Sequence, residues 1–174
     1  MGRSGAFGKE ILVMGVLSSD VGIEEAVLAE LARLFGPAET VTPRQEFKWT
    51  DYYVHEMGEP IWRYYIQFRD FVDPSGLAVV KTRTNAIEAE FAAGGGRRRI
   101  NLDPGLLAPG RFVLATTKDR AHRIALSDGI YAELTLIFEK KEFHALPWTY
   151  PDWASEPVRA MLGQWRKRIF ALPN

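Results

Sequence analysis

The sequence of 174 residues contains no cysteine. This absence excludes a disulfide scaffold, a zinc site built on thiolates, an iron–sulfur cluster and a cysteine nucleophile. No uninterrupted apolar stretch approaches the length that a membrane-spanning helix needs, and the apolar run at 11–17 is too short for a secretory signal. We therefore expect a cytoplasmic protein that does not enter a membrane.

The chain also lacks a net charge, because 22 Lys and Arg residues balance 22 Asp and Glu residues. Proteins that bind nucleic acid are usually basic, so nucleic acid is disfavoured as a partner. The balance hides two opposite regions: residues 1–60 hold five basic and ten acidic residues, whereas 97–123 holds seven basic and two acidic ones. The basic segment predicts a site for a phosphate or carboxylate group. A solvated surface is the alternative interpretation.

Hydrophobic periodicity predicts a mixed fold of helices and strands. Strands are expected at 11–17, 61–71, 99–102, 112–117, 123–127 and 130–139. Helices are expected at 23–35, 73–91 and 156–172. This order is compatible with an α+β ferredoxin-like sandwich that has an enlarged, mainly antiparallel sheet and a C-terminal helix. We expect a single domain over 1–174, with disorder at 1–9.

Turn-forming residues separate the strands expected in the second half of the chain. The Asp-Pro-Gly sequence at 103–105 predicts a turn directly after the short strand at 99–102. The Asp-Gly pair at 128–129 is typical of a hairpin. The two lysines at 140–141 mark a further turn. The second half is therefore expected to be mostly β structure.

The common catalytic and nucleotide-binding motifs are missing. Gly8 and Lys9 do not form a P-loop, because Arg3 stands where a glycine is required and Glu10 where Ser or Thr is required. The sequence contains no Gly-x-Gly-x-x-Gly, no His-Glu-x-x-His and no Gly-x-Ser-x-Gly. The residues therefore name no reaction, and whether the chain is an enzyme stays open.

Polar side chains share a face on two of the expected strands, because side chains alternate along a strand. Arg99, Asn101 and Asp103 fall on one face of the first strand, and Tyr131 and Glu133 on one face of the other. Such groups can line a cleft, where the two carboxylates would serve catalysis and the other three would bind a ligand. The alternative is that they lie on the solvent-exposed face of a half-buried sheet.

His122 is the strongest candidate for catalytic proton transfer, because histidine titrates near neutral pH. It stands between Lys118 and Arg123, which are candidates for holding an anion. Trp148 is a candidate for stacking on a ring of the ligand. The alternatives are a histidine that caps a turn and a tryptophan that fixes a loop over the core.

A weak site for a divalent metal is conceivable at the polar segment around Asp51. A helix there would place Asp51 and His55 on one face, with Glu56 adjacent. Three such residues in a polar loop often occur together by chance. A divalent metal therefore stays an open cofactor, with Asp51 and Glu56 as its candidate ligands.

Eight short motifs are specific in combination. They are TDYY at 50–53, EMG at 56–58, KxxTNxIE at 81–88, NLDPG at 101–105, LATTKD at 114–119, HRI at 122–124, DGIYAE at 128–133 and PWTYPD at 147–152. Together they resemble an uncharacterised bacterial family of small single-domain proteins, classed only as a domain of unknown function. The resemblance covers nearly the whole chain. It implies a shared polar site, with Glu56, His122 and Glu133 at motif positions and His55 at a variable one.

Two functional hypotheses follow. The first is binding of, or catalysis on, a small anionic ligand at a polar cleft, phosphorylated ligands included. The alternative is a noncatalytic module that binds a protein or a second copy of itself through its exposed aromatics and opposite charges. One observation separates them, namely whether a set of polar motif residues converges in one pocket. That set is Asp51, Glu56, Asp103, His122, Arg123 and Glu133.

Overall fold

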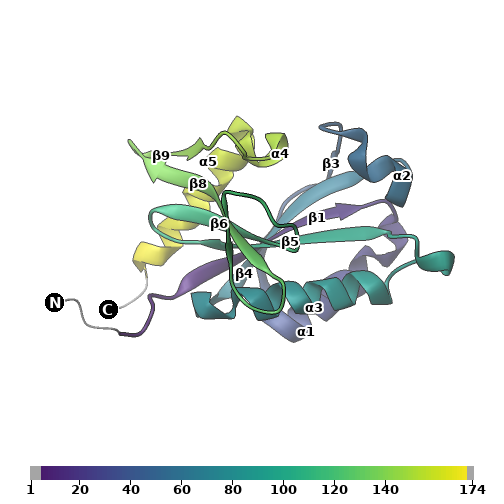
Figure 1. The fold of residues 1–174 in the computed structure, drawn as a ribbon, viewed down its shortest axis with the longest axis horizontal. Helices are drawn as coiled ribbons and strands as arrows, with labels where there is room; N and C mark the ends of the chain where they lie inside the picture. Colours follow the sequence, from purple (N-terminus) through teal and green to yellow (C-terminus); the bar gives the residue numbers. More distant parts are fainter. Residues whose placement is uncertain (1–4, 172–174) are drawn as a thin grey trace.

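A single antiparallel sheet forms the centre of the protein. The structure is a computed structural model, which describes residues 5–171 (Figure 1). Within that part the sheet has nine strands, in the order β2-β4-β1-β5-β6-β8-β7, with β3 paired to β4 and β9 paired to β8. The strands are β1 (Glu10–Ser18), β2 (Ala38–Val41), β3 (Gln45–Glu46), β4 (Trp62–Val72), β5 (Ile100–Leu107), β6 (Arg111–Thr116), β7 (Arg123–Ala125), β8 (Tyr131–Glu139) and β9 (Glu142–Ala145).

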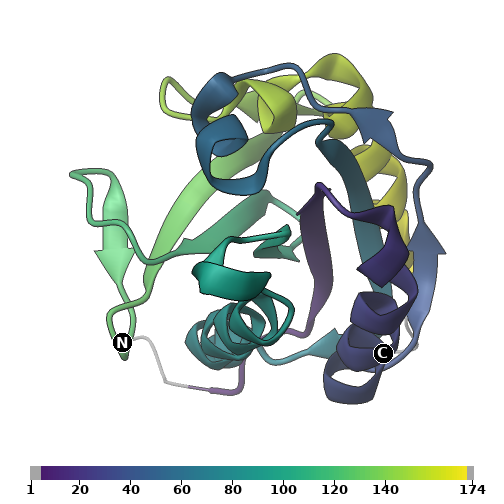
Figure 2. The ribbon, with the colours of Figure 1, turned by 90° about the vertical axis from the view of Figure 1, so that its right-hand side faces the viewer.

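Helices cover both faces of this sheet. They are α1 (Glu24–Phe35), α2 (Val54–Met57), α3 (Leu77–Glu90), α4 (Pro151–Ala154) and α5 (Glu156–Trp165), with 3-10 turns η1 (Val21–Ile23), η2 (Asp51–Tyr53), η3 (Pro74–Gly76), η4 (Gly94–Gly96) and η5 (Arg166–Ala171). Helices α1 and α3 lie side by side on one face, and α4 and α5 lie on the other (Figure 2). Within residues 5–171, no helix combines the length and apolar character needed to cross a membrane.

Strand β1 is an interior strand between β4 and β5, and all nine of its residues are buried. Leu12 and Met14 contact the core under α1 and α3, whereas Ile11 and Val13 contact the core under α5. A strand that is buried on both faces needs a continuous apolar run rather than alternation. The strand predicted at 11–17 is confirmed for this reason.

The first two predicted helices are confirmed as α1 and α3, and an aspartate caps the 3-10 turn that precedes each of them. The carboxylate of Asp20 accepts a hydrogen bond of 2.9 Å from the N–H of Gly22 at the start of η1, which leads into α1. The carboxylate of Asp73 accepts one of 3.0 Å from the N–H of Ser75 before α3. Both contacts satisfy backbone donors that a helix start leaves free. Gly36, with φ at 86°, ends α1.

The strand predicted at 99–102 is present as the first part of β5, which begins at Ile100. The turn predicted at 103–105 is wrong, because β5 continues through these residues to Leu107. Two contacts keep the segment extended. The side chain of Asp103 binds Arg63 and Asn101, so it does not bond to its own backbone as a turn would require. At Gly105, an added Cβ would lie 2.5 Å from the ring of Phe112, so glycine permits a close contact with β6.

The remaining predictions concern turns and the chain ends. The turns at 128–129 and 140–141 are confirmed, since Asp128, Lys140 and Lys141 all have positive φ. The helix predicted at 156–172 begins as expected but becomes the 3-10 turn η5 after Trp165. The disorder predicted at 1–9 falls partly on residues 1–4, which lie outside the described residues.

The predicted fold class is confirmed as a mixed α and β protein with a large antiparallel sheet and a C-terminal helix. The ferredoxin-like arrangement stays a prediction. Under the α1 and α3 face, the core contains side chains from β1, β4 and β5. Under the α5 face, the core includes the fully buried Trp153 of α4. A small third cluster around Met57 supports the segment that carries η2 and α2.

Candidate functional site

The sheet opens between β5 and β6. These strands pair only from Gly105 with Leu114 to Leu107 with Phe112. Pro104, which has no backbone N–H to donate, stands where this pairing ends. Among the described residues, the first half of β5 therefore has β1 as its sole strand partner. A pocket of about 550 Å³ lies at this opening, with residues of β5, β6 and α3 in its lining.

Side chains of α3 take the place of the missing strand along β5. The N–H of Leu102 donates to the carboxylate of Glu88 at 2.7 Å, and the ammonium of Lys81 donates to the carbonyl of Leu102 at 2.7 Å. Buried backbone groups need such partners. Burial raises the pKa of Glu88, and the charges of Lys81 and Arg98 oppose this rise. Lys81 and Glu88 therefore keep the opening in the sheet stable.

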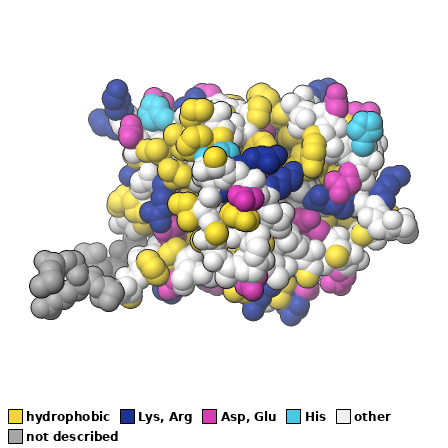
Figure 3. Space-filling view, in the orientation of Figure 1, with side chains coloured by type: hydrophobic (Ala, Val, Ile, Leu, Met, Phe, Trp, Pro, Cys, Tyr) yellow, Lys and Arg dark blue, Asp and Glu magenta, His cyan; other side chains and the backbone are white. Residues whose placement is uncertain are grey.

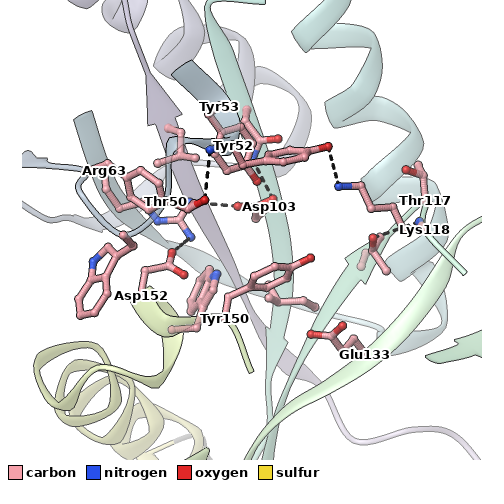
Figure 4. A pocket seen from close by; sticks show the side chains of 18 of the residues that line it. Thr50, Tyr52, Tyr53, Arg63, Asp103, Thr117, Lys118, Glu133, Tyr150 and Asp152 are labelled. Carbon is pink, nitrogen blue, oxygen red and sulfur yellow. Dashed lines mark hydrogen bonds and ion pairs between the residues drawn. The ribbon is translucent and has the colours of Figure 1, made fainter. Parts of the chain in front are cut away.

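Arg63 of β4 is the central cation of the pocket floor. Its Nη1 lies 3.0 Å from the carboxylate of Asp103, and its Nη2 lies 2.6 Å from that of Asp152. Its guanidinium carbon also lies 5.0 Å from the ring centre of Tyr65 and 5.1 Å from that of Trp153. Burial disfavours the charged form, but the two carboxylates outweigh it and raise the pKa of Arg63. Arg63 is thus a permanently charged link between β5 and α4 (Figure 4).

The two carboxylates bound to Arg63 differ in their environment. Burial opposes the ionisation of Asp103, but Arg63 and Lys81 outweigh it and hold the pKa of Asp103 below its ordinary value. The amide of Asn101 donates a further hydrogen bond of 2.9 Å to Asp103. Burial prevails at Asp152 and raises its pKa, although Arg63 opposes the rise. The floor therefore presents an ionised carboxylate at Asp103, whose side chain is 26% exposed.

A second network surrounds Glu133 of β8, which is 1% exposed. One carboxylate oxygen of Glu133 accepts a hydrogen bond of 2.7 Å from Nε of Arg123 and lies 3.0 Å from Nε2 of His122. The other oxygen is buried and has no partner among the described residues. The ring of His122 stacks on Trp148 with the centroids 4.7 Å apart, and Trp148 donates to the carbonyl of Leu134. Trp148 therefore orients His122 toward Glu133.

Lys118 lies at the edge of the pocket, on the segment that joins β6 to β7. Its ammonium is 3.0 Å from the hydroxyl of Tyr52 and 4.5 Å from the centre of that ring. Figure 4 shows this contact near Tyr150, Asp103 and Glu133. Figure 3, drawn in the orientation of Figure 1, shows basic side chains near the middle of the visible face, with hydrophobic ones beside them. The pocket thus combines charged groups with aromatic walls.

All eleven predicted site residues lie in the described part of the chain, and the pocket brings five of them together. These are Asn101, Asp103, Lys118, Arg123 and Glu133. The lining does not include His122, Arg99, Tyr131, Trp148, Asp51 or Glu56. Of the six motif residues expected to converge, three therefore line the pocket, namely Asp103, Arg123 and Glu133. His122 and Trp148 reach the pocket indirectly, through Glu133. Arg99 precedes β5 and turns away to Asp20 and to the carbonyl of Phe91.

Sequence reasoning missed several lining residues. Those with charged contacts are Arg63, Lys81, Glu88, Arg98 and Asp152, and those that supply aromatic walls are Trp49, Tyr52, Tyr53 and Tyr150. A signal was present for some of them. Arg63 stands between aromatic residues at the start of β4, and Lys81 and Glu88 fall on the same side of α3 as the buried Thr84. A charged residue on a buried face needs a charged partner, which marks such a position.

The two oppositely charged regions of the sequence neutralise each other partly within the chain. Three basic residues of 97–123 form ion pairs with acidic residues of 1–60. These pairs are Arg98 with Glu56 at 3.2 Å, Arg99 with Asp20 at 3.0 Å, and Arg111 with Glu10 at 2.6 Å. Much of the basic segment is therefore bound to the protein itself and is not free for a ligand.

The structure adds no support for the metal site proposed from the sequence. Within residues 5–171, no three or more His, Cys, Asp and Glu side chains are arranged to hold a metal ion. Glu56, one of its two candidate ligands, forms its ion pair with Arg98 instead. The metal site at Asp51 and Glu56 stays a prediction from sequence.

The family described as a domain of unknown function (DUF4416) matches residues 9–169. The chain belongs to the DUF4416 family. This match confirms the family that the sequence motifs indicated. The DUF4416 chain matches no curated protein and no solved structure. Its function is therefore argued from the site itself.

Proposed function

We propose that the DUF4416 chain binds a small anionic molecule in the pocket between β5 and β6, with the ammonium of Lys118 facing the anion. One observation carries the proposal. Five basic side chains line the pocket among the described residues, and four of them, Arg63, Lys81, Arg98 and Arg123, have a carboxylate partner. Lys118 has none within residues 5–171, because its contact is the neutral hydroxyl of Tyr52.

The charge of the lining supports an anion rather than a cation. Among the described residues, five basic side chains face four acidic ones, which are Glu88, Asp103, Glu133 and Asp152. The acidic groups are already bound by the four paired cations, so the remaining positive charge lies at Lys118. A hydroxyl gives up its place beside an ammonium readily, because an anion forms the stronger, charge-assisted hydrogen bond.

We propose binding rather than catalysis because the expected proton donor does not face the pocket. His122 lies behind Glu133, and the ring of His122 rests on Trp148. Proton transfer between His122 and a ligand would have to pass through the buried carboxylate of Glu133. Because the sequence leads us to expect a cytoplasmic protein, we propose that the ligand is a molecule of the cytoplasm.

The test is a thermal-shift series with inorganic phosphate, AMP and glucose 6-phosphate, in which a bound ligand raises the unfolding temperature. We expect at least one of these anions to stabilise the protein. Lys118→Ala should weaken that binding by roughly 10- to 100-fold, the loss expected for one charge-assisted contact of about 1.5–3 kcal/mol.

Arg120→Ala is the matched control for Lys118→Ala. Arg120 carries the same charge on the same connecting segment, but its guanidinium contacts only the carbonyl of Asp119 among the described residues, and it does not line the pocket. The ligand-induced shift should survive this change. The proposal is wrong if no anion stabilises the protein, or if Lys118→Ala and Arg120→Ala bind equally well.

Self-association is the second candidate function, and the edge of the sheet favours it. Strand β7 is the last strand on its side, where Ile124 is 71% exposed and Leu126 is 44% exposed. An open edge strand with apolar side chains can pair with a second copy. Light scattering at low and high salt would detect a dimer, and Ile124→Glu should dissociate it. A wild-type monomer at high concentration would remove this candidate.

A further inference from the structure

We infer that the ligand is an acidic sugar, a ring with several hydroxyl groups and one phosphate or carboxylate group. This inference rests on the proposed function, because it uses the same pocket and gives Lys118 the same role. Three properties of the lining lead to it, namely exposed aromatic rings, the ionised carboxylate of Asp103 and an ammonium at Lys118 that has no carboxylate partner among the described residues. The volume of about 550 Å³ is within the usual range for small-molecule pockets, about 300–1,000 Å³.

The aromatic walls call for a ring with apolar faces. Trp49, Tyr52 and Tyr150 all line the pocket, yet they stay 52%, 58% and 45% exposed. They come from two segments that are far apart in the sequence, one around η2 and one directly before α4. Core packing does not account for such exposed rings. A sugar ring presents C–H groups on its faces, which contact the electron-rich faces of aromatic side chains favourably.

The hydrogen-bond acceptors of the lining favour a ligand with several hydrogen-bond donors. Asp103 is ionised, and each of its oxygens accepts one hydrogen bond within the protein, from Arg63 and from Asn101. A carboxylate has about four acceptor sites, so sites remain. The side chain of Asp103 is 26% exposed, so a ligand in the pocket can reach these sites. Hydroxyl groups around a sugar ring can donate to such acceptors.

The same acceptors disfavour a nucleotide. A nucleobase also stacks on aromatic rings, but its edge carries acceptors next to its donors. An acceptor that faces the carboxylate of Asp103 would be repelled and left unpaired. A neutral sugar, in turn, would leave Lys118 without an anion. The combination therefore selects a ligand with hydroxyl groups on the ring and a single anionic group.

Isothermal titration calorimetry on the full chain tests this selection. The probes are the 6-phosphates of glucose, mannose and galactose, the matching uronic acids, the matching neutral sugars, inorganic phosphate and AMP. We expect at least one acidic sugar to bind at least tenfold more tightly than its neutral form, than inorganic phosphate and than AMP. The sugar phosphates and the uronic acids distinguish the two sources of the anionic group.

Variants of Tyr150 show whether the aromatic wall contributes. Tyr150→Ala should weaken binding of the acidic sugar about fivefold or more and leave binding of inorganic phosphate unchanged. Tyr150→Phe keeps the ring and should retain most of the affinity. Phe170→Ala removes a ring that is 61% exposed and does not line the pocket, so it should change nothing. Equal loss in Tyr150→Ala and Phe170→Ala would overturn the role of the wall.

The outcomes separate this inference from the proposed function. If AMP or inorganic phosphate binds more tightly than every acidic sugar and Lys118→Ala abolishes that binding, the sugar inference fails and the proposed function stands. If neutral and acidic sugars bind equally and Lys118→Ala has no effect, anion binding fails. If none of the anionic probes binds, both fail.

Discussion

Replacing Arg63 by leucine removes the cation that joins two carboxylates in the floor of the pocket. Arg63 is 5% exposed and lies 3.0 Å from Asp103 and 2.6 Å from Asp152. In Arg63→Leu both carboxylates would lose their ion pair while remaining within the fold. Leucine is shorter than arginine but apolar and fills part of the space beside Trp153, so the larger part of the expected effect is electrostatic.

The size of this effect follows from the burial of the two partners. Removing one member of a buried ion pair typically costs about 3–5 kcal/mol, because the other charge is left buried and unpaired. The side chain of Asp152 is only 9% exposed, whereas that of Asp103 is 26% exposed and can recruit water. We therefore expect the lower end of the range, a loss of about 3 kcal/mol in the free energy of unfolding.

Urea unfolding followed by tryptophan fluorescence measures this loss, as a lower midpoint at an unchanged slope. Arg69→Leu is the matched control on the same strand. Arg69 pairs with Glu39 at 3.1 Å, but its side chain is 59% exposed, and such surface pairs contribute less than about 1 kcal/mol. The reasoning is refuted if Arg63→Leu destabilises the protein no more than Arg69→Leu does.

Two further predictions concern β5. Gly105→Ala should lower the free energy of unfolding by about 1–3 kcal/mol, because its new methyl group would lie 2.5 Å from the ring of Phe112. Gly110→Ala is the control, because a methyl group there meets nothing within 4 Å. Equal thermal stability of the two variants would contradict this explanation. The pKa of Asp103 is lower in the folded protein than in the unfolded chain, where it is about 4. Ionised Asp103 therefore stabilises the fold above that pH, and this contribution is lost as the pH falls through the pKa of the folded state. The urea midpoint of Asp103→Asn should therefore fall less steeply than that of the wild type between about pH 5 and pH 2, and parallel curves would exclude this role.

Local sequence patterns predicted the elements whose structure depends on local chemistry. Strand β1 follows directly from an apolar run, and helix α1 from the helical spacing of its apolar residues. The turn predicted at 103–105 was wrong because contacts with distant residues determine the conformation of this segment. Asp103 is held by Arg63, which is 40 residues away in the sequence, and no local pattern reveals that contact.

In the candidate site, too, some residues follow from local patterns and others depend on distant contacts. Alternation along a strand correctly grouped Asn101 with Asp103, and an acidic residue inside an apolar strand marked Glu133. Arg99 was grouped with them wrongly, because β5 begins only at Ile100 and Arg99 binds Asp20. The opening between β5 and β6 depends on the strand order, which brings segments from all parts of the chain together. Sequence patterns alone do not supply that order.

The position of β1 between β4 and β5 has a consequence for synthesis of the chain. The strand is made first, yet its two edges pair with β4 and β5, and Ile11 lies opposite Phe71 on one side and Leu107 on the other. Until Leu107 has left the ribosome, the most apolar strand of the protein has at least one edge open to other chains. The nascent chain must therefore be released as far as Leu107 before β1 can be paired with both β4 and β5.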